Sequence, residues 1–279
     1  VYASGNSVFV SNDGGTNFDD LGTNFGNGPK MIGVADNATS SADQSVVYVL
    51  EATDGNFGQS FEAIYKSTDS GQTFVSTNLQ GKNYLGYNFD GEDDRGQAPR
   101  DMDIVVSSAN TEHIIVGGIN SWNSTDSGAS FDISSHWFLP TANFENVGYC
   151  HADIDIMKYV DGILYAGTDG GFFKATDTNN ITGTFWTDLS EGLSNRQFYR
   201  IGVSQTSPPV IVGGSQDNGS CVLRTDGLWY HWWGADGGES LVDKTNTTTI
   251  YGSAQFGSFV GSDDSGENLF GVTPPDDKG

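Results

Sequence analysis

A short polar motif that recurs along the chain constrains its fold more than any other feature. The segments 11–18, 67–74 and 124–131 share the pattern Ser-x-Asp-x-Gly-x-x-aromatic, and 262–269 has Leu in the aromatic place. Two weaker copies lie between 131 and 262. The Asp residues of the six copies are 38 to 57 residues apart: Asp13, Asp69, Asp126, Asp177, Asp226 and Asp264. Such regular recurrence indicates a repeated structural unit.

The residue types of this motif predict a hairpin turn, here called the Asp turn. An Asp carboxylate can accept hydrogen bonds from backbone N–H groups two or three positions further on, and Gly supplies a positive φ. The Ser or Thr hydroxyl can close the same turn from its other side. The trailing aromatic residue is then expected to be buried between neighbouring sheets. We therefore expect the six Asp residues to have a structural role.

Strand-like runs precede the Asp turns at a regular distance, and a second, earlier run is equally regular. No stretch has a convincing helical period. The clearest runs before the turns are 7–10, 63–66, 114–119, 171–174 and 258–260. A period of about 40–50 residues is typical of a four-stranded propeller blade. The sequence thus predicts an all-β fold, a β-propeller of four-stranded antiparallel blades with about six blades present.

The first blade is shorter than the others. Only the runs 1–4 and 7–10 precede its turn, whereas the other blades have room for three strands. A closed propeller needs the missing inner strand, so we expect a propeller that is incomplete at one or both ends. Propellers of 279 residues commonly form one unit, and we predict a single domain over 1–279 that belongs to a larger secreted protein.

The charge of the chain excludes some partners and favours others. Its 36 acidic and 12 basic residues give a net charge of −24, which disfavours binding to nucleic acid or to anionic membranes. No apolar run of about 18 residues is present, so we expect no direct membrane insertion. The same excess attracts divalent cations. One loop concentrates acids without the spacing of an EF-hand, and calcium is a candidate there: Asp90, Glu92, Asp93 and Asp94.

The two cysteines, Cys150 and Cys221, are 71 residues apart. This separation excludes a CxxC metal or redox motif. A disulfide between them and two separate buried thiols both agree with the sequence.

Polar residues that could carry chemistry lie outside the Asp turns. In 150–157 polar and apolar residues alternate, which predicts a strand with His151, Asp153 and Asp155 on one face. Three glycine-rich segments, 167–171, 213–220 and 234–239, each carry a carboxylate. We expect a ligand face opposite the Asp turns with these residues: His151, Asp153, Asp155, Asp169, Gln216, Asp217, Asn218, Asp236 and Glu239. A solvated strand face with ordinary hairpins is the other interpretation.

An aromatic strand, 229–233, is a further candidate. Alternation places Trp229, His231 and Trp233 on one face and the remaining two aromatic residues on the other. Such faces can stack on sugar rings, although burial between blades is their commoner use.

The Asp turn resembles the Asp box of the bacterial neuraminidase repeat (BNR) family, which includes sialidases, some endoglucanases and sortilin- or Vps10-like propellers. The order of 151–153, 168–171, 197–199, 216–219 and 235–238 resembles secreted, sortilin-like "glycosyl hydrolase-like" propellers of Bacteroidetes. Many of these carry a type 9 secretion sorting domain, so the resemblance implies a secreted or cell-surface location. Family members often have a second His where this chain has Asp155, which favours an oxygen-rich calcium site over a transition-metal site.

Enzymatic activity has less support than binding. A sialidase needs an arginine triad, and no arginine stands in the expected Arg-Ile-Pro setting: Arg95, Arg100, Arg196, Arg200 and Arg224. No Gly-x-Ser-x-Gly motif is present. We therefore predict a non-catalytic binding module for a glycan, a peptide or another surface protein. The alternative is a glycoside hydrolase that acts on a polysaccharide through paired carboxylates.

Overall fold

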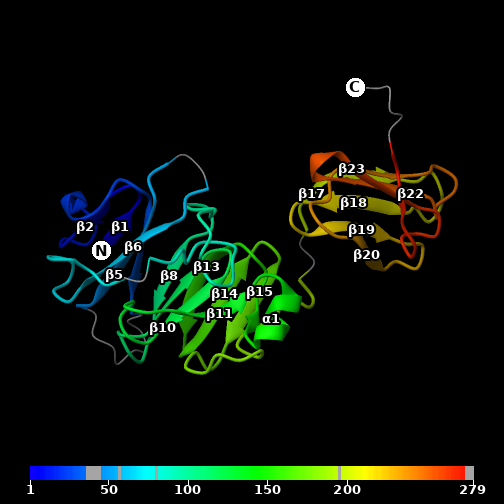
Figure 1. The fold of residues 1–279 in the computed structure, drawn as a ribbon. Helices are drawn as coiled ribbons and strands as arrows, with labels where there is room; N and C mark the ends of the chain where they lie inside the picture. The colour runs from blue at the N-terminus through cyan, green and yellow to red at the C-terminus, as the bar shows by residue number, and fades with distance from the viewer. Residues whose placement is uncertain (36–44, 56–57, 79–80, 194–195, 274–279) are drawn as a thin grey trace. The chain divides into compact units, whose positions relative to one another are not determined.

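The computed structural model describes residues 1–35, 45–55, 58–78, 81–193 and 196–273. The chain forms two compact units, Val1–Glu191 and Gly192–Gly279, whose strands run from blue to green and from yellow to red in Figure 1. The described residues are nearly all β, with one short α-helix, α1 (Leu139–Glu145). None of their helices has the length and apolar character that crossing a bilayer requires.

The first unit contains four sheets. In chain order their strands are β1 (Tyr2–Ser4), β2 (Val8–Val10) and β3 (Asp19–Asp20); β4 (Lys30–Val34), β5 (Val47–Ala52), β6 (Phe61–Ser67) and β7 (Val75–Ser76); β8 (Asp103–Val106), β9 (Ile114–Gly117), β10 (Ser121–Ser124), β11 (Asp132–His136) and β12 (Gly148–Tyr149); and β13 (Ile154–Val160), β14 (Ile163–Thr168), β15 (Gly171–Ala175) and β16 (Thr187–Asp188).

The second unit contains two four-stranded sheets. They consist of β17 (Phe198–Val203), β18 (Ile211–Ser215), β19 (Gly219–Leu223) and β20 (Trp229–Trp233), and of β21 (Ser240–Val242), β22 (Ile250–Ala254), β23 (Ser258–Ser262) and β24 (Phe270–Gly271).

Each sheet is a meander in which consecutive strands pair antiparallel, as in a propeller blade. The first strands of consecutive sheets lie side by side: β4 with β8, β8 with β13, and β17 with β21. The predicted all-β fold is therefore confirmed: the chain is a β-propeller built mainly from four-stranded antiparallel blades. One blade gains a fifth strand, because β12 adds parallel to β11 after α1.

The first sheet has three strands, in the order β1-β2-β3. Its strand β2 leads into the first Asp turn, as the third strand does in the other sheets. Its neighbour in the next sheet is β4, which lies beside β1 as β8 lies beside β5. The strand that this sheet lacks is thus equivalent to the inner strand of the other blades, as the short first repeat indicated.

Four Asp turns share the same hydrogen-bond network, shown here for Asp69. The Ser67 hydroxyl donates to Asp69 Oδ1 (2.7 Å) and accepts from the Gly71 N–H (2.8 Å). Thr73 donates its backbone N–H to Oδ1 (2.9 Å) and its hydroxyl to Oδ2 (2.6 Å). The same pattern recurs at Asp13, Asp126 and Asp264. The carboxylate thus joins the two sides of each hairpin.

The two weaker copies are built differently. Asp177 accepts a hydrogen bond from the Asn179 N–H (3.0 Å). Asp226 accepts from the Leu228 N–H (2.9 Å) and from the Tyr230 hydroxyl (2.8 Å). Both carboxylates therefore close a short turn over the residue that follows them, and Asp226 also accepts from the side chain of the fourth residue on, Tyr230.

The residue that ends each Asp turn is buried less uniformly than expected. Phe131 is 6% exposed, whereas Phe18 and Leu269 are 44% and 46% exposed. Phe18 follows a strand of the first sheet in the first unit. Leu269 follows a strand of the last sheet in the second unit. Among the described residues, each of these sheets has a neighbouring sheet on one side within its unit.

Removing the charge of one Asp turn tests its role. Hydrogen bonds from the fourth residue on lower the pKa of Asp13, Asp69 and Asp264 to about 2, from 3.8. Their stabilising effect is therefore complete above about pH 4 and is lost as the pH falls through 2. We expect Asp69→Asn to lower Tm by about 2–4 °C at pH 7.

Thermal unfolding at pH 7 and at pH 2 measures this effect, and the two proteins should unfold at similar temperatures at pH 2. The matched control is Asp161→Asn, an exposed residue with φ +51° in the turn between β13 and β14, where Asn is well tolerated. Equal Tm values for the wild type and Asp69→Asn at pH 7 would contradict the prediction.

Candidate functional site

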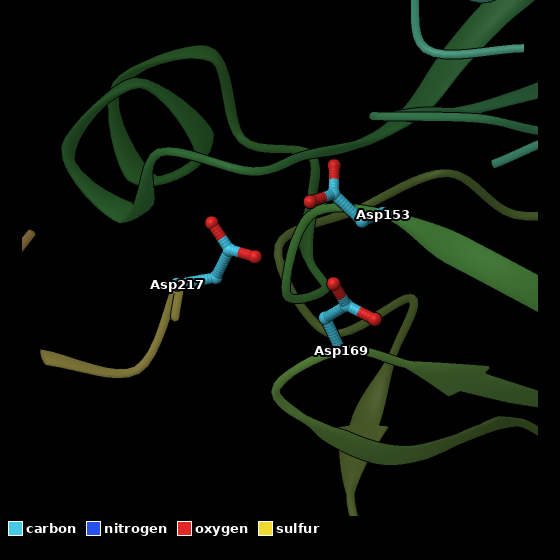
Figure 2. Close-up of side chains that lie close together, drawn as sticks. All are labelled: Asp153, Asp169 and Asp217. Atoms are coloured by element: carbon cyan, nitrogen blue, oxygen red, sulfur yellow. The ribbon is translucent and has the colours of Figure 1, made fainter. Parts of the chain in front are cut away.

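The carboxylates of the first unit gather at the end of the blades opposite the Asp turns. Strand β13 begins at this end, and the turn from β14 to β15 returns to it, because Ile154 pairs with Thr168. Strand β8 also begins here, and its Asp103 Oδ2 accepts the Met157 N–H of β13 (2.5 Å). Figure 2 shows Asp153 and Asp169 approaching each other from these two adjacent segments. Their nearest carboxylate oxygens lie within 4.8 Å.

Two side chains of the loop before β8 hold this group together. Arg100 donates from Nη1 to Asp155 Oδ1 (2.9 Å) and from Nη2 to Asp169 Oδ1 (2.7 Å). Gln97 donates from Nε2 to Asp153 Oδ1 (2.9 Å). The charges of Asp169 and Asp155 raise the pKa of Arg100 further. One guanidinium thus bridges a carboxylate of β13 and one in the turn between β14 and β15.

A fourth carboxylate, Asp101, lies beneath this bridge. It is 1% exposed, and neither of its oxygens has a hydrogen-bond partner among the described residues. Its nearest cation is the Arg100 guanidinium, whose Nη1 lies 3.9 Å from Asp101 Oδ1. Burial, followed by the charge of Asp153, raises the pKa of Asp101 to about 8. Burial and the charge of Asp169 raise that of Asp153 to about 6.

The expected alternation along 150–157 is wrong. Asp153 has φ +65°, and a β-bulge separates Ile154 from Ile156 in the pairing with β14. Ile154 is therefore fully buried whereas Ile156 is 61% exposed. The strand begins only at Ile154, so the three ionisable residues do not share one regular strand face. Asp153 and Asp155 nevertheless both lie at Asp169, Asp153 through the close approach of their oxygens and Asp155 through Arg100.

His151 lies at the same end of the first unit, where its ring contacts Gly170. A Cβ atom on Gly170 would lie 1.9 Å from His151 Cδ2, so the imidazole packs directly against the glycine backbone. His151 Nδ1 lies 3.1 Å from the carbonyl oxygen of Ala152. This close approach is a structural reason for the glycine that follows Asp169.

The second unit holds the other predicted residues in its own cluster. Asp236 Oδ1 accepts the Asp217 N–H (2.8 Å), and its Oδ2 accepts from Gln255 Nε2 (2.8 Å). The Asn218 carbonyl accepts from Arg196, and Gln216 accepts from the Tyr199 hydroxyl. Glu239 Oε2 lies 3.8 Å from Arg200 Nε. A single ligand face that joins both clusters stays a prediction.

The acidic loop that suggested calcium uses two of its carboxylates to close turns. Asp93 accepts the N–H groups of Tyr87 (2.8 Å) and Asn88 (3.4 Å), and Asp90 accepts that of Glu92 (3.0 Å). Glu92 and Asp94 are exposed. Calcium binding by these four residues therefore stays a prediction, and the turns give the acids another role.

Both cysteines are free, buried thiols. Cys150 packs in the core of the first unit with Ile154 and Phe173, and burial raises its pKa well above the usual value. Cys221 lies on β19 of the second unit, and burial raises its pKa as well. The structure therefore has the two buried thiols and not the disulfide, since each side chain is enclosed by its own unit.

An aromatic cluster in the first unit was not recognised from the sequence. This aromatic shelf consists of the exposed rings of Tyr87, Trp137 and Phe138 and the buried ring of His136. Trp137 stacks on His136 at a centroid distance of 5.9 Å, and it donates from Nε1 to the Tyr87 carbonyl (3.3 Å). Trp137 and Phe138 are 40% and 49% exposed. Three consecutive aromatic rings at the end of a strand were the available sequence signal.

A cavity of about 510 Å³ adjoins the shelf. It is lined by Gly58, Tyr87, Asn88, Asp93, Asp94, Arg95 and Gly96. Burial and then the charge of Asp153 raise the pKa of Tyr87. Tyr87 lines the cavity and accepts from Trp137, so the cavity and the shelf adjoin each other. By comparison, the predicted aromatic strand β20 buries Trp232 (6% exposed) and exposes Trp229 (49%) in the second unit.

The chain resembles known proteins at the level of the fold. No protein-family model matches it, and no curated protein does. Among solved structures, it is similar to a GH74 enzyme from Niastella koreensis (16% identity, TM-score 0.43, 95% of this chain and 42% of that one). A GH74 xyloglucanase from Xanthomonas campestris (13%, 0.43, 98% and 43%) and YCF48 from Cyanidioschyzon merolae (14%, 0.41, 97% and 80%) are also similar. The chain spans less than half of either GH74 protein, and no function follows from likeness this distant.

The buried carboxyl of Asp101 predicts an unusual pH dependence. Because its pKa is about 8 in the folded chain and 3.8 otherwise, the folded state keeps a proton that the unfolded state releases. This contribution to stability is complete below pH 4 and is lost as the pH rises towards 8. Asp101→Asn lacks this loss, so we expect its Tm to exceed that of the wild type by roughly 2 °C or more at pH 8.

Thermal unfolding from pH 4 to pH 8 in the presence of EDTA measures the difference, which should grow with pH. Glu92→Gln, an exposed acid that loses the same charge, is the matched control. A difference that stays constant across this range would contradict the prediction.

Proposed function

We propose that the chain is a non-catalytic Asp-box propeller, of the sortilin-like type, from a secreted or cell-surface protein, and that it binds a neutral glycan at the aromatic shelf. The observation that supports this most is that Trp137 and Phe138, next to the buried ring of His136, stay exposed beside a cavity. Large apolar rings that remain exposed beside a concave surface are typical of ligand sites.

A sugar fits this combination of groups. The faces of Trp137 and Phe138 offer flat apolar surface for a pyranose ring, while the carboxylate and amide groups around the cavity accept or donate hydrogen bonds to hydroxyls. A net charge of −24 repels anionic polysaccharides at moderate ionic strength. The chemistry therefore favours a neutral glycan over an acidic one.

The carboxylates themselves favour binding over hydrolysis. Asp101 and Asp153 are 1% and 6% exposed, so a glycosidic oxygen has little access to either acid. Asp155 and Asp169, which are more exposed, are both bound to Arg100. A general acid and a nucleophile must both reach the bond that breaks.

A substitution in the shelf tests the proposal. We expect Trp137→Ala to weaken binding of a neutral polysaccharide, for example xyloglucan, mixed-linkage β-glucan or xylan, by at least about fivefold, because the loss of one stacked ring removes about 1 kcal/mol or more of contact. Isothermal titration calorimetry with this panel measures the affinities, and polygalacturonate serves as the acidic comparison.

The matched control for this experiment is Trp229→Ala. Trp229 is also exposed, at 49%, but it lies on β20 in the second unit. Equal affinity of the wild type and Trp137→Ala for every glycan that binds, or preference for polygalacturonate, would exclude the shelf as a neutral-glycan site.

The second candidate function is a glycoside hydrolase. It is favoured by the pair Asp153 and Asp169, of which one has its pKa raised to about 6 and the other is ion-paired with Arg100. Their oxygens lie within 4.8 Å, which is nearer to the separation of about 5–5.5 Å found in retaining enzymes than to that of inverting ones. In this case Asp153 is the general acid and Asp169 the nucleophile.

Release of reducing sugar from the same neutral polysaccharides distinguishes the two candidates. We expect no turnover by the wild type. If turnover is observed, and if Asp153→Asn abolishes it while Trp229→Ala leaves it unchanged, the hydrolase replaces the binding module.

A further inference from the structure

A buried side chain, Asn120, connects the two segments of the chain that form the aromatic shelf. It lies in the turn between β9 and β10 and is 1% exposed. Its Nδ2 donates to the carbonyl oxygens of Gly86 (3.1 Å) and Tyr87 (3.2 Å). Its Oδ1 accepts the backbone N–H of Trp137 (3.0 Å). One amide thus joins the loop that lines the cavity to the segment after β11 that carries the exposed rings.

The indole ring of Trp137 meets the same network at Tyr87. Trp137 donates from Nε1 to the Tyr87 carbonyl (3.3 Å), which is the oxygen that also accepts from Asn120. A carbonyl oxygen has two lone pairs and can accept both hydrogen bonds. Trp137 is therefore held at two points. Its backbone binds Asn120 directly, and the edge of its ring is linked to Asn120 through the Tyr87 carbonyl.

These hydrogen bonds are important because packing covers the Trp137 ring only in part. The ring stacks on the buried His136, but the side chain is still 40% exposed. A side chain that moves freely before binding loses conformational freedom when a ligand orders it, and this loss lowers the affinity. The neighbouring Phe138 has a separate anchor, since its backbone N–H donates to His136 Nδ1 (3.0 Å). The effect of Asn120 is thus directed at Trp137.

We propose that Asn120 is a positioning residue of the glycan site, which fixes the Trp137 ring against Tyr87 at the edge of the cavity and so preorganises the shelf. This inference rests on the proposed glycan binding. Asn120 is too deeply buried to contact a ligand itself. We therefore expect its effect on affinity to pass through the Trp137 ring.

A second buried asparagine, Asn123 in β10, distinguishes positioning from a general contribution to stability. Asn123 is 5% exposed and is also hydrogen-bonded at both ends of its amide. Its Oδ1 lies 2.6 Å from His113 Nε2, and its Nδ2 donates to the Thr178 carbonyl (2.8 Å). Removing either asparagine leaves buried polar groups without partners, which destabilises the fold. The partners of Asn123 lie outside the shelf, so only the loss of Asn120 should affect the Trp137 ring.

The experiment compares Asn120→Ala with Asn123→Ala in the full chain. Thermal unfolding gives their stability, calorimetry with the neutral polysaccharides named above gives their affinity, and NMR gives the signal of each indole N–H. The Trp137 signal is the one that Trp137→Ala lacks. We expect both substitutions to lower Tm. Asn120→Ala alone should shift the Trp137 signal and weaken glycan binding by about threefold or more, as coupling within one hydrogen-bond network predicts.

A double-mutant cycle tests the route of this effect. In the Trp137→Ala background, Asn120→Ala should cause no further loss of affinity, because the ring through which it acts is gone. Asn120→Asp repeats the comparison if Asn120→Ala folds poorly, since it keeps the shape and the acceptor but lacks the amide donors.

Three results would overturn the inference: an unchanged Trp137 indole signal in a folded Asn120 variant, unchanged affinity of that variant for a glycan that the wild type binds, or an equal loss of affinity in Asn123→Ala. If the wild type binds none of the polysaccharides, the proposed function fails. The indole signal then still decides whether Asn120 holds the Trp137 ring in place.

Discussion

The hydrogen bonds of the Asp-turn carboxylate fix the geometry on which the blades depend. In four turns the same Asp binds the Ser two positions before it and the backbone and side chain of the residue four positions after it. This joins the third strand of a blade to the fourth with a constant loop length. Four blades therefore end alike, and the first strands of consecutive blades within a unit lie side by side. At this end the carboxylates stabilise the turns, and the candidate functional residues lie at the opposite end.

The opposite end of the first unit shows what happens when acids lack such backbone donors. There the loop before β8 places Arg100 between Asp155 and Asp169, and the buried Asp101 has no hydrogen-bond partner for its oxygens within the part of the chain that the structure describes. Hydrogen bonds lower the pKa of Asp69 to about 2, while burial raises that of Asp101 to about 8. One residue type is thus held as an anion by hydrogen-bond donors in the Asp turn and favoured in its protonated form where it is buried.

Most of the fold could be predicted because its signals are local. The spacing of Asp13, Asp69 and Asp126 gives the blade period, and the short first repeat gives the three-stranded sheet. Prediction of the candidate site was less complete. The acids of 151–155 and 167–171 were found, but the reason that they meet was not: a bulge after Ile154 breaks the alternation that was assumed. Arg100, Gln97 and Asp101 were not identified as their partners, because they belong to a loop some 50 residues earlier in the chain.

The sequence by itself determined the repeat, the all-β class and the acidic character of the chain, since each depends on residues within one hairpin or on composition alone. The tertiary structure decided which side chains are buried, which are paired and which rings stay exposed. Trp137 and Asp101 illustrate the difference, because nothing in their neighbouring residues shows that one is 40% exposed and the other 1%. Burial and pairing result from the packing of one blade on the next, which is a long-range property that a local pattern does not contain.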